Sequence, residues 1–418
     1  MRILLATEYF YPISRGGTEM YVYQLAKELL LNGHECMVLS LSNDIAHAEY
    51  EGIQISYIPF IDDISQEVEN PRNYEALSKI VKDFQPDVFH LHTYTTSLGV
   101  NHLKKIANEG IATAFTAHIT SFSCIRGDLM LYGKNICDGV LIENRCMNCL
   151  LESRGFKNSA LRNIIVNLST IPLTKKLFPT LKNYDNKSEA ISIFKNIVDK
   201  VIVVSNWQSV VLKDNGFLEN KTSICRQAVN SNDVIQNKEI VLSEPLKIGF
   251  VGRIVVLKGL HMLLSIMKDL PTSKAKLSVA AIKSNLELEY YHTNFNLAKS
   301  LGVDWNDNLN AEEVIQFLDN IDLLVVPSSW LETGPYVIFE ALARKVPVLS
   351  YNKGGAVELI NNNHTGWLIN SDEELREKLI ELVNDKELVA NASRNIQEVR
   401  DTKMLYNEMN TIYSSLLK

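Results

Sequence analysis

The stretch "IDLLVVPSSWLETGPYVIFEALA", residues 321–343, holds a strand, a loop and a helix in a pattern that decides the fold. A short apolar run ends in a polar loop, and residues that favour helices follow. Pro335 suits the first helical position, because the N–H that it lacks would have no intrahelical partner there. We therefore expect Glu332 in the loop before the helix, and Glu340 about a turn and a half inside it.

The same succession of apolar run, loop and helical pattern recurs along most of the chain, which favours parallel sheets with helical crossovers. It runs to about residue 120, stops between 121 and 190, and resumes at "VDKVIVVSNW". A second series begins at "LKIGFVGRI", just after "SEPLK" at 243–247, where we place the domain junction. The sequence thus predicts an α/β protein with two doubly wound, Rossmann-like domains.

The expected domains are an N-terminal one at 1–240 with an insertion at 121–190, a C-terminal one at 245–385, and a final helix within 386–418. Two doubly wound halves imply a cleft between them. In such sheets ligands bind beyond the carboxyl ends of the strands, so motifs that directly follow strands are the candidates for a site.

Composition excludes several other classes of protein. A chain of 418 residues with 46% hydrophobic residues suits a globular protein of two domains. Its formal net charge of -7 argues against nucleic acid as a partner. No apolar run reaches the roughly eighteen residues of a membrane span. The start "MRILLATEYFYP" is typical of a first strand rather than a signal peptide, so we expect a cytoplasmic protein.

Two glycine pairs follow predicted strands. Gly16 and Gly17 precede a predicted helix, and their backbone can approach a ligand closely while the helix start offers free amides to an anion. Gly354 and Gly355 form a second turn of this kind. Each pair is equally compatible with an ordinary tight connection between a strand and a helix.

Arg253 and Lys258 follow the strand "KIGFV" on a loop and could offset the negative charge of a departing diphosphate. Taken alone, they could also be two solvated basic residues. The chain contains no aspartate-x-aspartate pair, which makes a metal-assisted diphosphate site of that type less favoured. Glu332 and Glu340 flank the predicted helix start, where carboxylates can accept hydrogen bonds from sugar and ribose hydroxyls. The alternative is a pair of surface glutamates.

Four stretches together resemble the retaining family 4 glycosyltransferases of GT-B fold: "GGTEMYVYQLAKELLLNGHE", "VGRIVVLKG", "ETGPYVIFEALA" and "GGAVELI". The resemblance covers most of the chain, with the motifs in the right order. It implies two domains facing across a cleft and transfer of a sugar from a nucleotide donor, a UDP- or GDP-sugar, with retained anomeric configuration. It also implies same-face attack without a protein nucleophile and without a cofactor needed for catalysis.

The resemblance assigns roles to single residues. Arg253 and Lys258 would bind the diphosphate, Glu332 would hold the hydroxyls of the donor sugar, and Glu340 would meet the ribose. His118, in "TAHIT" after a predicted strand, would lie near the donor sugar, although it could also be a packed core histidine. Glu332, His118, Arg253 and Lys258 are thus the candidate catalytic residues.

The remaining donor contacts implied by the resemblance come from backbone. The loop with Gly16 and Gly17 would lie near the donor phosphate and the acceptor, on the N-terminal domain. Phosphate and sugar would be supported by the backbone of Gly334, Pro335, Tyr336 and Val337. The final helix would cross back onto the first domain.

The insertion contains four cysteines: Cys124, Cys137, Cys146 and Cys149. Four thiolates can form a closed structural zinc site, but only the last two cysteines have the tight C-x-x-C spacing. Some members of the resembled family have a similar cysteine set here. The sequence leaves two alternatives open, a structural zinc ion and four reduced, unligated thiols.

Residues 154–187 are rich in Lys and Arg, almost free of acids, and interleaved with apolar residues. In an otherwise acidic protein, this favours a surface for an anionic membrane that carries a lipid-linked acceptor. A solvated loop with an apolar inner face is the alternative. The protein would then lie in the cytoplasm, peripherally at the inner face of the membrane.

The sequence as a whole predicts a retaining glycosyltransferase that acts on a glycan or glycolipid acceptor in bacterial surface polysaccharide or glycoconjugate synthesis. Two alternatives remain at this point. A sugar-nucleotide epimerase or hydrolase would have a similar site, and a non-catalytic sugar-nucleotide-binding protein would retain the fold alone. The presence of Arg253, Lys258, Glu332 and Glu340 argues against the non-catalytic alternative.

Overall fold

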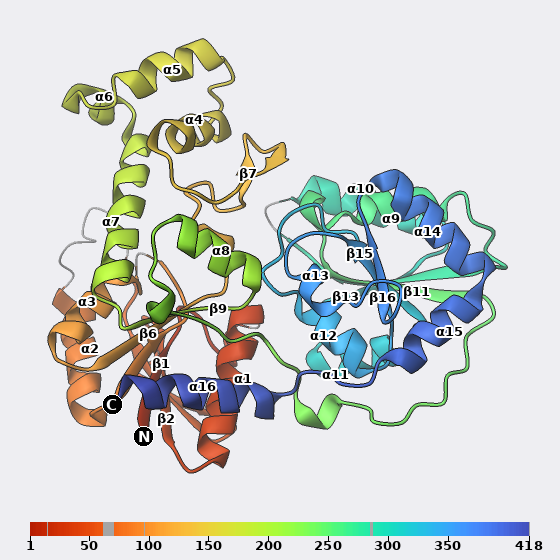
Figure 1. Ribbon diagram of the computed structural model, residues 1–418, viewed down its shortest axis with the longest axis horizontal. Coiled ribbons are helices and arrows are strands. Elements are labelled where there is room, and N and C mark those ends of the chain that lie inside the picture. Colours follow the sequence, from red (N-terminus) through yellow and green to blue (C-terminus); the bar gives the residue numbers. More distant parts are fainter. Residues whose placement is uncertain (15, 62–70, 96, 285–286, 418) are drawn as a thin grey trace. The chain divides into compact units, whose positions relative to one another are not determined.

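The computed structural model describes residues 1–14, 16–61, 71–95, 97–284 and 287–417 (Figure 1). The chain divides into two compact units. Unit 1 comprises Met1–Arg226 together with Thr402–Lys418, and unit 2 comprises Gln227–Asp401.

Within the described residues, unit 1 contains a large sheet with the strand order β10-β9-β6-β5-β1-β2-β4-β3. All neighbouring strands pair in parallel except β3 and β4, which are antiparallel. The strands are β1 (Arg2–Ala6), β2 (Glu35–Leu41), β3 (His47–Tyr50), β4 (Ile53–Ile58), β5 (Val88–Leu91), β6 (Ala112–Ala117), β9 (Lys200–Val203) and β10 (Thr222–Ile224).

Helices cover both faces of this sheet. They are α1 (Gly17–Leu31), α2 (Pro71–Phe84), α3 (Val100–Asn108), α8 (Asn206–Asp214) and α16 (Thr402–Leu416), with a 3-10 turn, η4 (Glu219–Lys221), before β10. Alternate residues of a strand point to opposite faces. Phe89 and Leu91 of β5 therefore join the core beneath α2 and α3. His90 between them points the other way, where its Nδ1 lies 2.6 Å from the hydroxyl of Tyr413 on α16.

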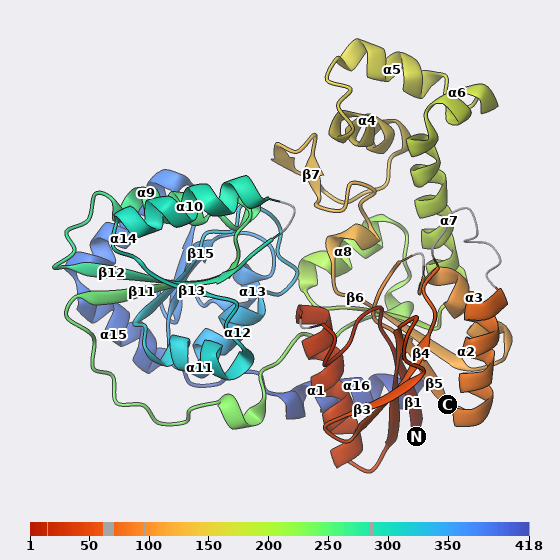
Figure 2. The ribbon, with the colours of Figure 1, turned by 180° about the vertical axis from the view of Figure 1, so that it is seen from behind.

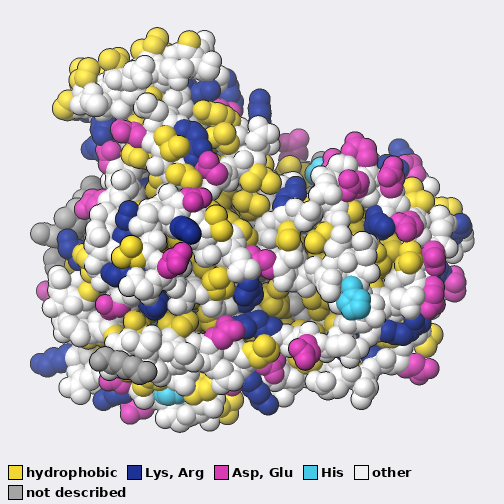
Figure 3. Space-filling model, viewed as in Figure 1, with side chains coloured by type: hydrophobic (Ala, Val, Ile, Leu, Met, Phe, Trp, Pro, Cys, Tyr) yellow, Lys and Arg dark blue, Asp and Glu magenta, His cyan; other side chains and the backbone are white. Residues whose placement is uncertain are grey.

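The insertion predicted at 121–190 forms a helical extension of unit 1. It contains η2 (Thr120–Phe122), a short ribbon of β7 (Met130–Leu131) and β8 (Asn135–Ile136), α4 (Glu143–Ser153), α5 (Ser159–Asn167), α6 (Pro172–Leu177), η3 (Pro179–Leu181) and α7 (Lys182–Asn196). A small core of its own includes Met147, Leu151 and Ile165. Figures 1 and 2 both show α5 and α6 at the end of the extension farthest from the sheet. Hydrophobic side chains gather on the surface over these helices (Figure 3).

Unit 2 contains, among its described residues, a fully parallel sheet in the order β13-β12-β11-β14-β15-β16. Its strands are β11 (Leu246–Arg253), β12 (Ala275–Ile282), β13 (Asp304–Asp307), β14 (Leu323–Val326), β15 (Val348–Tyr351) and β16 (Gly366–Ile369). One core packs the sheet against α9 (Leu260–Met267), α10 (Leu288–Ser300), α14 (Asp372–Asn384) and α15 (Lys386–Asn395). The other packs it against α11 (Ala311–Asp319), α12 (Tyr336–Ala343) and α13 (Ala356–Leu359).

The division between the units differs from the junction that we placed at 243–247. Residues from 227 onward already belong to unit 2, because they attach to its helix α12 and to its last residues. The amide of Ile235 donates to the carbonyl of Ala343 at 3.0 Å, and Val229 forms a bridge with Asp401. Between these contacts lies η5 (Ser231–Asp233).

The single final helix expected near the C-terminus is two helices. α15 ends at Asn395 in unit 2, and α16 begins at Thr402 in unit 1. Ile396, directly after α15, is buried in the second core of unit 2, and Val399 packs against it. This packing fixes the connecting segment in an irregular conformation. Among the described residues of the chain, no helix combines the length and the apolar character that crossing a membrane requires.

The contact between β5 and α16 gives a first prediction. Tyr413→Phe removes a fully buried hydroxyl and leaves Nδ1 of His90 without that partner. We expect the free energy of unfolding of unit 1 to fall by about 1–3 kcal/mol, the cost of an unsatisfied buried polar group. Urea denaturation followed by circular dichroism measures it.

Tyr406→Phe is the matched control, because its hydroxyl lies 3.0 Å from Nε2 of His34 in a part-buried position on the same helix. Water can replace that hydroxyl, so we expect a change within about 0.5 kcal/mol. Equal effects of the two substitutions would contradict the buried role of Tyr413.

Candidate functional site

Two loops of unit 2 meet beyond the carboxyl ends of adjacent strands. The 3-10 turn η6 (Val256–Lys258) follows β11, and the loop beginning at Pro327 follows β14. The amide of Ser329 donates to the carbonyl of Leu257 at 2.8 Å, which ties the two loops together. Gly259 ends η6 with a φ of 73°, and a Cβ there would lie 2.0 Å from the carbonyl oxygen of Pro327. A glycine is therefore required for the loops to approach so closely.

This approach brings Lys258 and Glu332 into contact. The ammonium nitrogen of Lys258 lies 2.6 Å from Oε1 of Glu332, and the two side chains are only 19% and 13% exposed. The same oxygen accepts hydrogen bonds from the hydroxyl of Ser328 and the indole N–H of Trp330, each at 2.8 Å. Burial by itself raises the pKa of Glu332, but Lys258 and these hydrogen bonds outweigh it and lower the pKa overall. The carboxylate is therefore ionised and held in one orientation.

The second glycine pair supports the backbone of this loop. The amide of Gly355 donates to the carbonyl of Glu332 at 2.7 Å. Gly354 has a φ of 59°, and a Cβ on it would lie 2.7 Å from that same carbonyl oxygen. A Cβ on Gly355 would lie 2.5 Å from the carbonyl oxygen of Thr333. The turn after β15 thus fixes the position of Glu332 through close contacts between backbones.

The helix α12 begins directly after this loop. Pro335 precedes it as the N-cap, one position earlier than the first helical position that we expected, and Tyr336 and Val337 form its first turn. Gly334 lies against Gln227, whose side-chain oxygen would be 2.2 Å from a Cβ at that position. That oxygen is buried and has no hydrogen-bond partner among the described residues.

Glu340 lies on α12, one turn beyond its start. Burial and, secondarily, the nearby carboxylate of Asp233 raise its pKa to about 7 from an ordinary value of 4.5. Its protonation therefore changes near neutral pH. The pKa of Glu332, in the loop before α12, is thus lowered, whereas the pKa of Glu340, on α12, is raised.

Arg253 ends β11 and is exposed. Among the described residues it makes no ion pair, in contrast to Lys258. The structure therefore brings Lys258 and Glu332 together and places Glu340 on the adjoining helix. Arg253 remains exposed to solvent at the carboxyl end of β11, in the same sheet.

The other candidates belong to unit 1. Gly16 is the N-cap of α1, and Gly17 is its first residue. Tyr21, one turn further along α1, packs its ring edge-on against His118 at a centroid distance of 4.7 Å. His118 directly follows β6 and is buried. The start of α1 and His118 thus belong to one packed group.

His118 also contacts His92, which directly follows β5, with 3.0 Å between Nε2 of His118 and Nδ1 of His92. Burial lowers the pKa of His118 to about 3, so the ring is neutral. Nε2 of His92 is buried without a hydrogen-bond partner among the described residues. The hydrogen bond between the two rings can run in either direction, depending on their tautomers.

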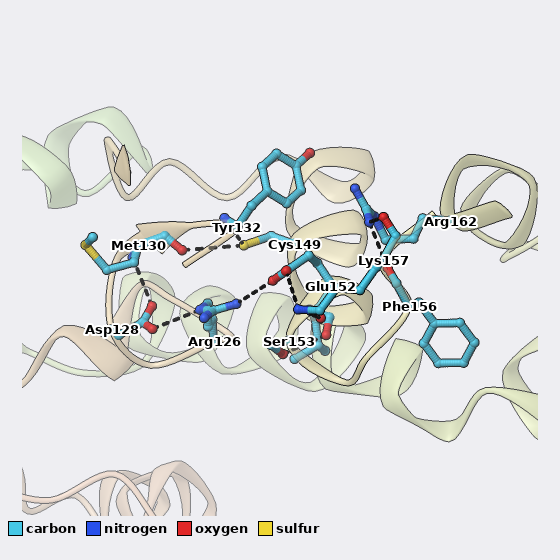
Figure 4. A network of polar contacts seen from close by, with 11 residues as sticks. Arg126, Asp128, Met130, Tyr132, Cys149, Glu152, Ser153, Phe156, Lys157 and Arg162 are labelled. Atoms are coloured by element: carbon cyan, nitrogen blue, oxygen red, sulfur yellow. Dashed lines mark hydrogen bonds and ion pairs between the residues drawn. The ribbon is translucent and has the colours of Figure 1, made fainter. Parts of the chain in front are cut away.

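The four cysteines of the insertion line one small cavity of about 20 Å³. Cys149 accepts from the amide of Tyr132 at 3.2 Å, and its sulfur lies 3.7 Å from the carbonyl of Met130 (Figure 4). Burial raises the pKa of the Cys149 thiol, as it does for Cys137 and Cys146. In the part of the chain that the structure describes, no three His, Cys, Asp or Glu side chains are arranged to hold a metal ion. The number and type of donors suit zinc, and zinc binding stays a prediction from the sequence.

Sequence reasoning missed five residues that shape these sites. Ser328 and Trp330 bind Glu332, Gln227 lies against Gly334, and His92 and Tyr21 contact His118. Ser328 and Trp330 lie in the same loop after β14 as Glu332, so their closeness in sequence could have indicated these contacts. The contacts of Gln227 and Tyr21 join distant parts of the chain, which no local pattern reveals.

The ion pair gives the second prediction. Lys258→Met or Glu332→Gln alone leaves a part-buried charged partner uncompensated, and each should lower the free energy of unfolding of unit 2 by about 1–3 kcal/mol. The double variant should lose less than the sum, with a coupling of about 1–3 kcal/mol measured by urea denaturation. The more exposed pair Lys378 and Glu381, at 2.6 Å on α14, is the control, with an expected coupling of about 0.3 kcal/mol. Additive effects at Lys258 and Glu332 would contradict a coupled pair.

Two protein families match separate parts of the chain. Residues 15–142 match the family described as Glycosyltransferase Family 4, and residues 231–399 match the family described as Glycosyl transferases group 1. The chain is 27% identical over 352 residues to an uncharacterized glycosyltransferase of Methanocaldococcus jannaschii, covering 82% of this chain and 90% of that one. It is 24% identical over 242 residues to the capsular polysaccharide biosynthesis glycosyltransferase CapM of Staphylococcus aureus, covering 55% and 62% of the two chains.

Among solved structures, HepE of Anabaena in complex with UDP and glucose is similar, with a TM-score of 0.67 and 16% identity over 99% of this chain and 100% of that one. This likeness concerns the fold, and it confirms the predicted class of two Rossmann-like domains. The two matched families, one on each of two mostly parallel-stranded α/β units, indicate that the chain is a glycosyltransferase of the GT-B fold.

Proposed function

We propose that the protein is a retaining hexosyltransferase that moves a sugar from a nucleotide-sugar donor to a glycan or lipid-linked acceptor in surface polysaccharide or glycoconjugate synthesis. The observation on which the proposal mainly rests is the part-buried contact of 2.6 Å between Lys258 and Glu332 beside the start of α12. It sets a cation, an ionised carboxylate and a helix N-terminus at the carboxyl edge of one parallel sheet.

In this proposal the diphosphate of the donor is bound by positive charge from two sources. The start of α12, after Gly334 and Pro335, is the positive end of the helix dipole, which suits an anion. Lys258 and the exposed Arg253 supply full charges on the neighbouring loop and strand end. As the bond to the leaving phosphate breaks, these groups stabilise the growing negative charge, and a divalent ion is not needed.

The carboxylates then hold the two polyols of the donor. Glu332, ionised and oriented by Lys258, accepts hydrogen bonds from the hydroxyls of the sugar. Glu340 accepts from the ribose. His118, neutral and in contact with His92, would lie near the donor sugar. The acceptor hydroxyl attacks on the face that the diphosphate leaves, and the departing phosphate oxygen takes its proton, so no protein nucleophile is required.

A UDP-sugar is the donor that we favour over a GDP-sugar. The similar structure of HepE contains UDP and glucose, and the fold is shared over nearly the whole chain. The name of the Staphylococcus aureus relative refers to capsular polysaccharide, which supports a surface glycan as the product.

A thermal-shift series with nucleotide sugars tests the donor. A UDP-hexose at about 100 times its Kd should stabilise the folded protein by about 2.7 kcal/mol and raise its melting temperature, whereas GDP-hexoses should not. Lys258→Met should abolish the shift and lower kcat/KM for sugar transfer by about 100-fold or more, because a transition-state cation is lost. Lys378→Met, which removes a half-buried cation of the same unit on α14, should retain both. A full shift in Lys258→Met would refute the assigned role.

The raised pKa of Glu340 predicts a pH dependence. A carboxyl with a folded pKa of about 7 and an ordinary value of 4.5 favours the protonated state on folding. Its contribution to stability is complete below pH 4.5 and is lost as the pH rises through 7. Relative to Glu340→Gln, the wild-type free energy of unfolding should therefore fall over this window.

Donor binding should change in the opposite direction, because the ionised carboxylate is the better acceptor for ribose hydroxyls. Affinity for UDP-glucose, whose diphosphate does not titrate here, should rise about tenfold from pH 6 to pH 8. Glu340→Gln should bind with no such rise, as measured by calorimetry. A flat wild-type profile would remove Glu340 from the ribose site.

A further inference from the structure

The helices α5 and α6 present an apolar outer face. Large aliphatic side chains on this face are each 45–67% exposed: Leu161, Ile164, Leu168, Ile171, Leu173 and Leu177. We call these six residues the outer face of the insertion. Figure 3 shows hydrophobic side chains gathered over α5 and α6, and Figures 1 and 2 place these helices at the far end of the extension.

The helix α5 is apolar on opposite sides. Ile165 and Val166 point inward and are buried in the small core of the insertion. Leu161, Ile164 and Leu168 recur at helical spacing on the outer side and remain exposed. A surface helix that belongs only to its own protein carries polar residues on its outer side. An apolar outer side therefore indicates a second apolar environment in contact with it.

The charges around the outer face have one sign. Residues 154–187 contain seven Lys and Arg and a single acid, Asp185, although the whole chain has a net charge of -7. The ammonium nitrogen of Lys175 lies 2.6 Å from Oδ2 of Asp185 and offsets its negative charge. Arg154, Lys176 and Lys182 are exposed, and among the described residues they make no ion pair. The local charge therefore suits an anionic surface.

The other cations of this region stabilise the extension itself. Arg162 is buried and donates to the carbonyls of Phe156 and Lys157 at 2.7 and 2.8 Å. Glu152 on α4 is paired with Lys157 at 2.6 Å and with Arg126 at 3.1 Å (Figure 4). These contacts fix the start of α5 against α4. The outer face is thus formed before any partner binds, and binding does not have to order it.

We propose that the outer face of the insertion docks on an anionic lipid bilayer, with its aliphatic side chains among the acyl chains and Arg154, Lys176 and Lys182 at the headgroups. An interfacial helix of this kind combines aliphatic residues with flanking basic residues. Protein interfaces instead concentrate their binding energy in Trp, Tyr and Arg, and none of the six residues is of these types. The inference rests on the proposed function for its purpose, since a lipid-linked acceptor lies at such a surface.

Vesicle flotation tests the inference without using catalysis. The full chain should bind vesicles of phosphatidylglycerol and phosphatidylcholine, and bind pure phosphatidylcholine vesicles at least about tenfold more weakly. Raising the salt from 0.05 to 0.5 M should reduce binding to the anionic vesicles, because exposed charges are screened. Absence of wild-type binding to anionic vesicles at low salt would overturn the proposal, while UDP-hexose thermal shifts would remain to support the proposed function.

Two sets of substitutions separate the apolar and charged contributions. Ile164→Ser, Leu173→Ser and Leu177→Ser combined should lower the partition coefficient on anionic vesicles at least about tenfold. The matched control combines Leu31→Ser, Val210→Ser and Leu218→Ser, at exposed aliphatic positions of the same unit, and should bind like the wild type. Equal losses in both sets would overturn the proposal.

The charge variant combines Arg154→Gln, Lys176→Gln and Lys182→Gln, and should lose at least about tenfold in anionic binding together with most of its salt dependence. Both test variants change exposed side chains and should retain the thermal shift with UDP-hexose, which shows that the protein is folded. Gel filtration provides a further check. If wild type forms a dimer that the aliphatic variant loses, the outer face contacts a second copy of the chain, and the bilayer proposal is wrong.

Discussion

Parallel pairing of β11 with β14 is the constraint on which the candidate site depends. These two strands are distant in sequence, yet Ile248 pairs with Leu323 in the middle of the sheet. Their carboxyl ends therefore meet, and the loops that follow them deliver Lys258 and Glu332 to one point. Gly259 permits this approach, because any Cβ at its position would overlap the carbonyl of Pro327. The part-buried ion pair is thus a consequence of the order of strands in the sheet.

An ion pair that is largely removed from water does little for stability by itself, since desolvation offsets most of its attraction. Its value here is orientation. Ser328, Trp330 and Lys258 converge on a single oxygen of Glu332, and the turn at Gly355 binds the carbonyl of the same residue. The site therefore presents an ionised carboxylate beside a cation before any ligand arrives. A preorganised charge pair of this kind does not have to rearrange as a diphosphate departs, which is the condition for effective electrostatic stabilisation.

Local sequence patterns predicted the strands, loops and helices that depend on residues close together in the chain. The strand, loop and helix of 321–343 follow from apolar runs and helix formers, and the two α/β series follow from their repetition. Features set by long-range contact could not be predicted in this way. The break between α15 and α16 depends on burial of Ile396 in a distant core, and the attachment of 227–243 to unit 2 depends on contacts with Ala343 and Asp401. Neither set of contacts can be predicted from composition alone.

The composition of the insertion allows two interpretations, and the structure shows that both apply to different residues. Interleaved apolar and basic residues at 154–187 fit both an inner packing face and an outer binding face. In α5 the two coexist, because a helix distributes neighbouring residues around its axis: Ile165 enters the core while Ile164 remains exposed. The basic residues divide similarly. Arg162 donates hydrogen bonds to carbonyls inside the fold, whereas Lys176 and Lys182 face solvent. A count of charges cannot distinguish these roles, and only the cations that the fold leaves unpaired can act on an external anionic surface.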